Sequence, residues 1–282
     1  MSGALDRKGK KERDAQDGCD KLARVSISYS DTVAFLPGES SPGRIIMPVC
    51  LGTDRTGTIE FRMLSRDRIE DALLVQRDSM RQECIAIGMG MYEDPGAPEE
   101  MQLVFREVIK DGCTVIAVDR SDRVVAVAFN KLHIPSQPEE TDPFGFFIEN
   151  NIKHRSCRDL IEFIDEIESR VDVFQKYNAR GAMEIFYIGT DPKCQKRGIG
   201  LEIAEKSIEV ARGLCARKLK QICVADGIVN EHVRPEVVFA VAASTFSQRI
   251  FAKLSFDTLA EVPSGVRRTS PTYAAAKGCP TG

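Results

Sequence analysis

The sequence contains no tryptophan, only three histidines and no two cysteines in a C-x-x-C spacing. The nine cysteines are scattered and odd in number, and the histidines lack metal-ligand spacing. We therefore expect free thiols, a reducing cytoplasmic setting and no metal. No apolar run approaches the roughly 20 residues of a membrane-spanning helix. The net charge of −3 gives no basic excess. The composition thus predicts neither a nucleic-acid nor a membrane partner.

Composition divides the 282 residues into three regions. Residues 1–57 are charged and rich in glycine, serine and proline, which predicts a poorly ordered extension. Residues 58–262 have the hydrophobic patterning of one globular domain. Residues 263–282 form an irregular tail rich in glycine, proline, alanine and serine.

Hydrophobic periodicity within the middle region predicts alternating strands and helices. Strands are expected at 58–63, 114–118, 124–129, 183–188, 222–225, 237–241 and 256–262. Helices are expected from 65 to about 88, after Pro98, around 160–171, at 198–212 and at 244–254. This order predicts an α/β fold with a mixed sheet.

The stretch 184–201 joins an apolar strand to a glycine-containing loop and then to a helix. Such a loop presents backbone N–H groups at the positive end of a helix, which suits a phosphate or pyrophosphate group. Glycines at 198 and 200 would let the anion approach the backbone closely. No Gly-Lys-Ser/Thr follows, and the first glycine of a dinucleotide fingerprint is missing. An ordinary strand-to-helix turn that uses glycine only for its shape is the alternative.

The spacing Gln-x-x-Gly-x-Gly at 195–200, after a strand and before a helix, resembles the acetyl-CoA-binding signature of the GCN5-related N-acetyltransferases. The resemblance implies a mixed, mostly antiparallel sheet that is flanked by helices and has splayed central strands. It also implies acetyl-CoA as cosubstrate. The pantetheine arm and thioester would lie along Ile188, Gly189 and Thr190. The pyrophosphate would lie on Gln195, Lys196, Arg197, Gly198, Ile199 and Gly200.

A second motif, Tyr92-Glu93-Asp94-Pro95, resembles the D-E-P element of insect arylalkylamine N-acetyltransferases. In that family the acid before the proline is the general base. The resemblance therefore implies that Asp94 is the base and Glu93 its acidic neighbour. An alkylammonium of pKa near 10 must lose a proton before it can attack a thioester, which is why a base is needed. The alternative is a solvated acidic turn before a proline.

The segment 244–256 resembles the superfamily helix beside the thioester, in which a tyrosine commonly protonates the departing thiolate. Phe251 stands at the tyrosine position and has no proton to give. In the insect enzymes a serine of this segment has been proposed for part of that role, which makes Ser244 and Ser247 the candidates. The alternative for Ser244 is a helix cap, and for Ser247 a packed small residue.

The resemblance implies transfer of acetyl from acetyl-CoA to a primary amine such as dopamine, octopamine, tyramine or serotonin, by direct attack in a ternary complex. Two alternatives stay open: the same fold acting on a polyamine or an amino acid, and a weakly active or non-catalytic CoA-binding protein. The superfamily closes its sheet with one further strand after the segment that here ends at Val262. That strand is either missing or formed poorly by residues 267–276.

Overall fold

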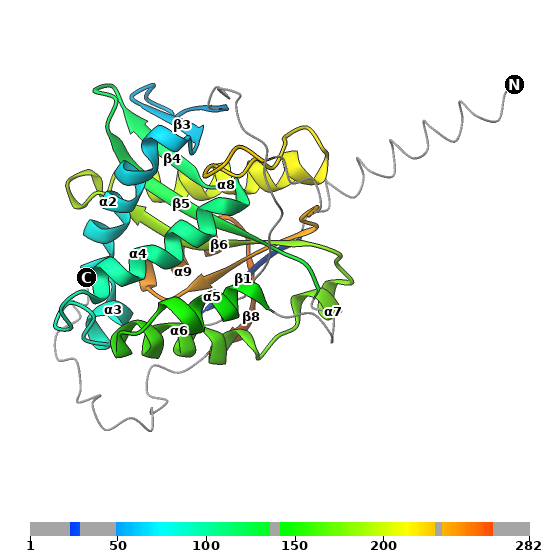
Figure 1. Cartoon of the computed structure of the whole chain (residues 1–282). Helices are drawn as coiled ribbons and strands as arrows, with labels where there is room; N and C mark the ends of the chain where they lie inside the picture. The colour runs from blue at the N-terminus through cyan, green and yellow to red at the C-terminus, as the bar shows by residue number, and fades with distance from the viewer. Residues whose placement is uncertain (1–22, 29–48, 136–141, 229–232, 262–282) are drawn as a thin grey trace, which may run out of the picture.

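The computed structural model of the chain describes residues 23–28, 49–135, 142–228 and 233–261, and its centre is one eight-stranded sheet (Figure 1). The strands are β1 (Ala23–Ser28), β2 (Cys50–Thr53), β3 (Ile59–Met63), β4 (Val115–Asp119), β5 (Val124–His133), β6 (Ala182–Thr190), β7 (Val237–Ala242) and β8 (Asp257–Glu261). Their order in the sheet is β2-β3-β4-β5-β6-β7-β1-β8. Pairing is antiparallel from β2 to β6 and parallel from β6 to β8. The expected mixed α/β sheet is confirmed.

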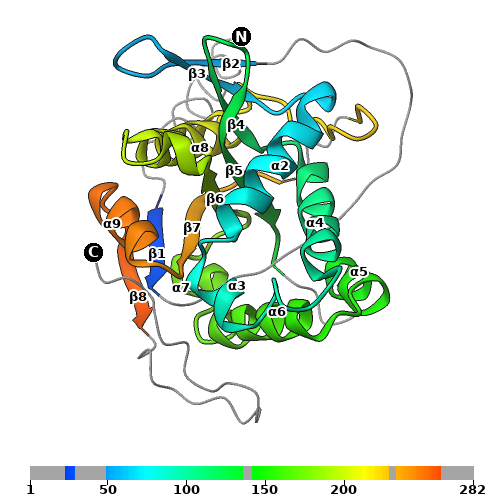
Figure 2. The same cartoon turned by 90° about the vertical axis from the view of Figure 1, so that its left-hand side faces the viewer.

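Helices cover both faces of the sheet (Figure 2). They are α2 (Ile69–Met80), α3 (Cys84–Gly88), α4 (Ala97–Val108), α5 (Pro143–Asn151), α6 (Arg155–Glu168), α7 (Val173–Tyr177), α8 (Ile199–Cys215) and α9 (Thr245–Lys253). One core cluster joins α8 and α9 to the sheet, and a second joins α2 and α4 to its other face. Residues of β4 alternate between the two, with Val115 in the first cluster and Ile116 in the second. Every residue of β5 is buried, as expected of a strand that is covered on both sides.

Strands β6 and β7 pair over only part of their length. Their parallel ladder runs from Ala182–Val237 to Ile185–Ala240 and then stops. Beyond it, β6 continues to Thr190 against β5 alone, while β7 continues to Ala242 against β1 alone. The two central strands therefore splay apart, as the family resemblance implied.

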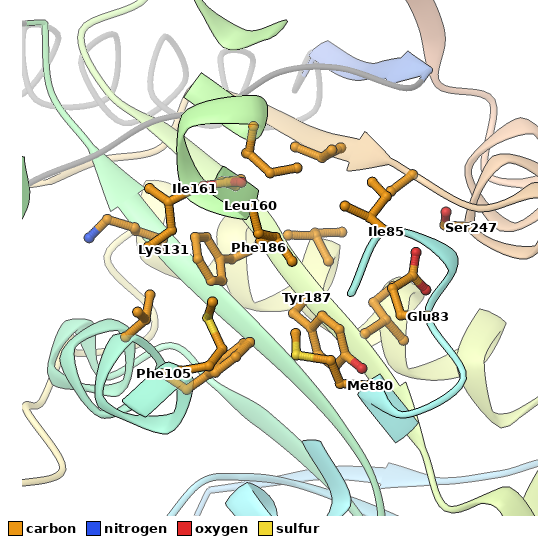
Figure 3. A pocket seen from close by; sticks show the side chains of 18 of the residues that line it. Met80, Glu83, Ile85, Phe105, Lys131, Leu160, Ile161, Phe186, Tyr187 and Ser247 are labelled. Carbon is orange, nitrogen blue, oxygen red and sulfur yellow. The ribbon is translucent and has the colours of Figure 1, made fainter. Parts of the chain in front are cut away.

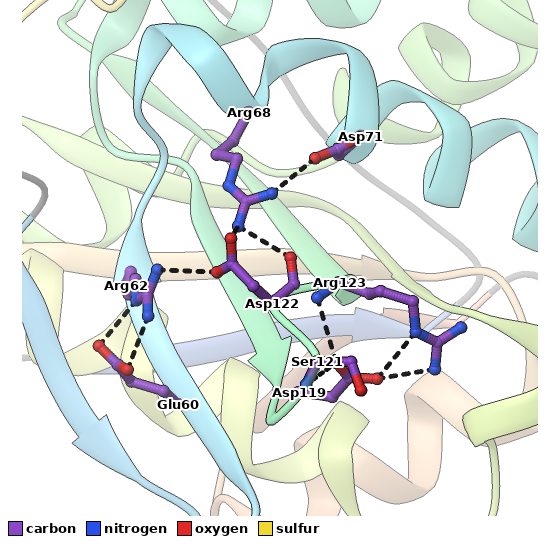
Figure 4. A network of polar contacts seen from close by, with 8 residues as sticks. All are labelled: Glu60, Arg62, Arg68, Asp71, Asp119, Ser121, Asp122 and Arg123. Atoms are coloured by element: carbon purple, nitrogen blue, oxygen red, sulfur yellow. Dashed lines mark hydrogen bonds and ion pairs between the residues drawn. The ribbon is translucent and has the colours of Figure 1, made fainter.

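The start of α2 is tied to the β4–β5 turn by a polar network (Figure 4). Arg68 donates to the Asp122 backbone oxygen at 2.8 Å, pairs with the Asp122 carboxylate and contacts Asp71 at 3.0 Å. Within the turn, Asp119 accepts from the Arg123 guanidinium at 2.7 Å. These contacts fix one end of α2, and the opposite end of the helix lies above β6.

The structure corrects the expected extent of the N-terminal extension. Residues 23–28 form β1, and residues 50–53 form β2, so part of the segment 1–57 belongs to the sheet. Strand β1 lies between β7 and β8 and is parallel to both. Residues 267–276, considered for a last strand, lie outside the described residues with the rest of the tail.

Two predicted elements also differ. Residues 224–226 form a turn, and Ile222 makes only an isolated bridge, so no strand forms at 222–225. The helix expected from 65 to 88 is broken between Met80 and Cys84. Of the described cysteines, six are free thiols, whereas Cys84 is disulfide-bonded. None of the helices in the described residues is long and apolar enough to cross a membrane.

We predict that Ser26→Pro lowers thermal stability. Ser26 pairs with Ala240 on one side and Thr258 on the other, and proline has no amide hydrogen for a ladder bond. An unpaired buried acceptor costs about 1–3 kcal/mol, which corresponds to a fall in Tm of several degrees, about 2–4 °C per kcal/mol. Calorimetry beside a Ser26→Ala control checks this. Equal Tm values for the two variants would contradict the placement of β1 in the sheet.

Candidate active site

A cavity of about 140 Å³ lies where β6 and β7 part (Figure 3). Its walls are mainly apolar and aromatic, and they come from strands β5, β6 and β7 and from helices α2, α3, α4, α5, α6 and α9. Phe105 and Phe186 are edge-to-face with ring centroids 5.7 Å apart, and Phe144 approaches Phe186 at 6.4 Å. The polar side chains on the lining are Glu83, Lys131, Asp165, Glu184, Tyr187, Ser244 and Ser247. A cavity of this kind suits a small molecule with an apolar body and a polar group.

Glu83 is a carboxylate on this cavity that the sequence analysis missed. It lies in the break between α2 and α3, in extended conformation with φ −78° and ψ 123°. Its Oε1 atom is buried and has no hydrogen-bond partner in the described part of the chain. Burial raises the pKa of Glu83 to about 7. A carboxylate of that pKa, with an oxygen free to accept, suits a general base at neutral pH.

Ser244 and Ser247 both lie on the cavity, and together they form the N-terminal cap of α9. The Ser247 N–H donates to Ser244 Oγ at 3.1 Å, and the Ser244 N–H donates to Ser247 Oγ at 3.1 Å. Their two hydroxyl oxygens are 3.0 Å apart. In Figure 3, Ser247 and Glu83 lie at the same end of the cavity, away from Lys131. Ser244 and Ser247 therefore both cap α9 and contact the cavity.

Phe251, at the position of the usual proton donor, is also on the lining. It is fully buried, and its ring packs against Phe256 with centroids 4.9 Å apart. Its environment is apolar, which is consistent with a side chain that shapes the cavity wall and takes no part in proton transfer.

The loop 195–200 follows β6 and leads into α8, as predicted. Gly198 has φ +85° and caps α8, and Lys196 has φ +62°. None of the backbone N–H groups of residues 195–200 donates to an acceptor in the described residues. Gln195, Lys196 and Arg197 are exposed. The loop is thus a set of unpaired amides at a helix N-terminus with two cations beside it, a geometry that suits an anion.

Two close approaches position this loop and its strand. A Cβ atom at Gly189 would lie 2.4 Å from Ser79 Oγ, so α2 packs directly on the backbone of β6. A Cβ atom at Gly200 would lie 3.2 Å from Ile250 Cδ1, which brings α8 against α9. Gln195 Nε2 donates to Gln82 Oε1 at 3.1 Å and links the loop to the turn that carries Glu83. Ile188 lies on the cavity and Thr190 ends β6.

Asp94 and Glu93 do not line the cavity. The two oxygens of Asp94 accept from His154 Nδ1 at 2.9 Å and from Ser156 Oγ at 2.8 Å. These hydrogen bonds, His154 first, lower the pKa of Asp94. Glu93 is exposed. The structure thus uses Asp94 to join the turn before α4 to the start of α6.

Nothing in the sequence marks Glu83 clearly. Apolar residues at 80, 84 and 87 keep helical spacing across the break, so periodicity predicts a continuous helix there. Among the described residues, no three His, Cys, Asp or Glu side chains gather as a metal site would require.

No protein-family model and no curated protein matches the sequence. Comparison with solved structures shows that the chain has the fold of the GCN5-related N-acetyltransferases. Arylalkylamine N-acetyltransferase 2 from Aedes aegypti matches with a TM-score of 0.53 and 17% identity, over 70% of this chain and 82% of that chain. A second structure from this mosquito, assigned as arylalkylamine N-acetyltransferase 7, matches with a TM-score of 0.50 and 19% identity, over 65% and 76% of the two chains.

We expect Ser244→Ala to lower the free energy of unfolding by about 1 kcal/mol, because the N3 amide of α9 loses its acceptor. Denaturant unfolding measures this. The exposed neighbour Thr245 supplies the control, and Thr245→Ala should change stability much less. If both variants unfold at the same denaturant concentration, Ser244 does not cap the helix.

Proposed function

We propose that this protein is an acetyl-CoA-dependent N-acetyltransferase that acetylates a primary amine, with an arylalkylamine as the preferred acceptor. The observation that carries the proposal is that two features lie on one strand, β6. An anion-binding loop ends one strand of a splayed pair, and the same strand lines a cavity that holds an unpaired carboxylate of raised pKa. One feature suits a pyrophosphate and the other a nucleophile that must lose a proton.

In this proposal the cosubstrate lies along β6. Residues 195–200 donate backbone N–H groups to its pyrophosphate, and Lys196 and Arg197 add positive charge. The free edge of β6 beyond Ile185 provides unpaired backbone groups for the pantetheine arm. This places the thioester beside Ile188 and Gly189. The Asp191 N–H donates to Val125 of β5, so by strand alternation the Gly189 N–H also points to β5 and the Ile188 N–H points to the free edge, where it is the candidate for holding the carbonyl oxygen.

The amine enters the cavity with its apolar body between the aromatic walls. Glu83, ionised, takes a proton from the ammonium group, directly or through one water. The neutral nitrogen attacks the thioester carbonyl, so that a C–N bond forms and the C–S bond breaks, and the nitrogen releases a second proton to water as the neutral amide forms. The sulfur leaves with the electron pair as a thiolate. Because a thiolate of pKa near 8.5 is a stable leaving group, the reaction tolerates Phe251 in place of a proton donor. Ser244 and Ser247 are the hydroxyls on the cavity that remain candidates for that proton.

Glu83 is a better candidate for the base than Asp94, for electrostatic reasons. Both oxygens of Asp94 accept hydrogen bonds and its pKa is lowered, so it is a weak base that is already in use. Glu83 has a buried oxygen without a partner and a pKa of about 7. The driving force for removing a proton from an ammonium group is therefore larger at Glu83.

A second acceptor class, a diamine or polyamine, is favoured by one further observation. Asp165 and Glu184 also lie on the cavity, and among the described residues on its lining Lys131 is the only basic one. Burial raises the pKa of Asp165 to about 6, with the charge of Asp142 contributing. A second cation on the acceptor, placed beside Asp165, would offset the repulsion between the Asp165 and Asp142 carboxylates.

The proposal predicts saturable acetyl-CoA binding by calorimetry and amine-dependent thiol release in a steady-state assay. An amine panel should include a phenylethylamine, an indolylethylamine, a diamine and an amino acid. Thiol release with at least one amine supports the enzyme. Binding without thiol release from any amine would instead indicate a non-catalytic CoA-binding protein. No binding at millimolar acetyl-CoA would reject the acyltransferase.

Glu83→Gln should lower kcat by about 10²- to 10⁴-fold, the usual contribution of a general base, and leave acetyl-CoA affinity unchanged. In the unmodified protein, kcat should fall as pH drops through about 7, because protonated Glu83 cannot accept a proton. The variant should lose that limb of the profile. Asp94→Asn, assayed in parallel, should retain the limb. If Asp94→Asn loses it and Glu83→Gln keeps it, the base is Asp94.

A further inference from the structure

Tyr187 of β6, the strand along which the cosubstrate is proposed to lie, is a lining residue of the cavity that carries a phenol hydroxyl. Tyr187 belongs to β6, immediately before Ile188, and its ring packs against Phe105 with centroids 5.3 Å apart. In Figure 3 its hydroxyl points toward the end of the cavity where Met80 and Glu83 lie. The charge of Glu83 contributes to the raised pKa of Tyr187, after the larger effect of burial. The phenol therefore stays protonated and lies within electrostatic reach of the carboxylate.

The direction of the hydrogen bond at Tyr187 follows from its partner. Its hydroxyl oxygen is 3.0 Å from Ser79 Oγ. Ser79 Oγ is also 2.7 Å from the carbonyl oxygen of Val75 and 3.1 Å from that of Gln76. Carbonyl oxygens only accept, and a serine hydroxyl has one proton, so Ser79 donates to the helix backbone. Tyr187 must then donate to Ser79.

Packing holds this arrangement in place. A Cβ atom at Gly189 would lie 2.4 Å from Ser79 Oγ and 2.9 Å from Tyr187 Cε1, so the strand backbone presses on both side chains. With its proton committed to Ser79, the phenol oxygen of Tyr187 keeps its lone pairs for another partner. On the cavity it is therefore an acceptor and not a proton donor.

We propose that the Tyr187 oxygen accepts a hydrogen bond from the reacting nitrogen of the acceptor amine and, together with Glu83, orients that nitrogen toward the thioester. This inference rests on the proposed amine acetyltransferase. Glu83 removes one proton, and Tyr187 holds a second N–H without removing it. Removal of the first proton leaves the nitrogen lone pair facing Glu83, and rotation of the amine about its hydrogen bond to Tyr187 turns the lone pair toward the thioester. Ser79 acts through Tyr187, as a positioning residue.

The first test is Tyr187→Phe, which removes the acceptor and keeps the ring that packs on Phe105. We expect kcat/KM for the amine to fall about 10- to 100-fold, the range for a hydrogen bond to a charged group. KM for the amine should rise, and the pH limb near 7 and the acetyl-CoA affinity should stay unchanged. Tyr177→Phe is the matched control, because Tyr177 does not line the cavity. An unchanged kcat/KM in a folded Tyr187→Phe protein would overturn the proposal.

The second test separates acceptor from donor. Ser79→Ala releases the phenol proton toward the cavity, where it would oppose the N–H of the amine. We expect kcat/KM to fall about 3- to 10-fold. This fall is smaller than the one expected when a hydrogen bond to a charged group is lost completely. If Tyr187 instead protonates the departing thiolate, Ser79→Ala should preserve or raise kcat, and Tyr187→Phe should lower kcat without raising KM. That pattern would overturn the acceptor assignment.

Binding supplies a readout independent of turnover. Calorimetry of the amine with the protein saturated in CoA should show weaker binding for Tyr187→Phe than for the Tyr177→Phe control. If the unmodified protein acetylates no amine, the proposed function fails. If it acetylates an amine with equal binding and kcat/KM in both variants, only the role of Tyr187 fails.

Discussion

The separation of β6 from β7 after the Ile185–Ala240 pair is the constraint on which the site depends. A sheet normally satisfies the backbone polar groups of each strand through its neighbours. Here β6 keeps β5 on one edge and β7 keeps β1 on the other, so each strand is held while the space between them opens. The cavity, the end of β6 and the N-terminus of α9 all meet at this opening. A fully paired β6–β7 ladder would leave no free edge of β6 along the cavity.

Helix α2 brings the chemical groups to that opening. Its first turn is tied to the β4–β5 turn by Arg68, and its last turn lies on the backbone of β6 at Gly189. Because both ends are fixed, Ser79 and the turn that carries Glu83 are held against β6. The hydrogen bond between Gln82 and Gln195 adds a contact from this turn to the loop 195–200. One helix thus positions the proposed base and the proposed amine-binding tyrosine together.

Asp94 and Glu83 are close in the sequence, but their different surroundings give their carboxylates different chemical properties. Asp94 accepts from His154 and Ser156, and these partners stabilise its charge. Glu83 is desolvated without such partners, so its charged form is disfavoured. The first is suited to joining two segments, and the second to accepting a proton. Residue type and a following proline do not distinguish these cases, because the difference lies in what packs around each carboxylate.

The fold class, most elements between residues 58 and 262 and the loop 195–200 could be predicted from the sequence, because periodicity and a strand-loop-helix spacing are local properties of contiguous residues. Glu83 could not, since residues 80, 84 and 87 keep helical spacing through the break that exposes it. Tyr187 could be placed on a strand, but its hydrogen-bond direction depends on Ser79, which lies 108 positions away in the chain. Strand β1 pairs with β7 across more than two hundred residues, and short strands carry little local signal. The sequence alone therefore determined most of the elements and the place of the loop 195–200, whereas tertiary packing decided which carboxylate is desolvated and which side chains share the cavity.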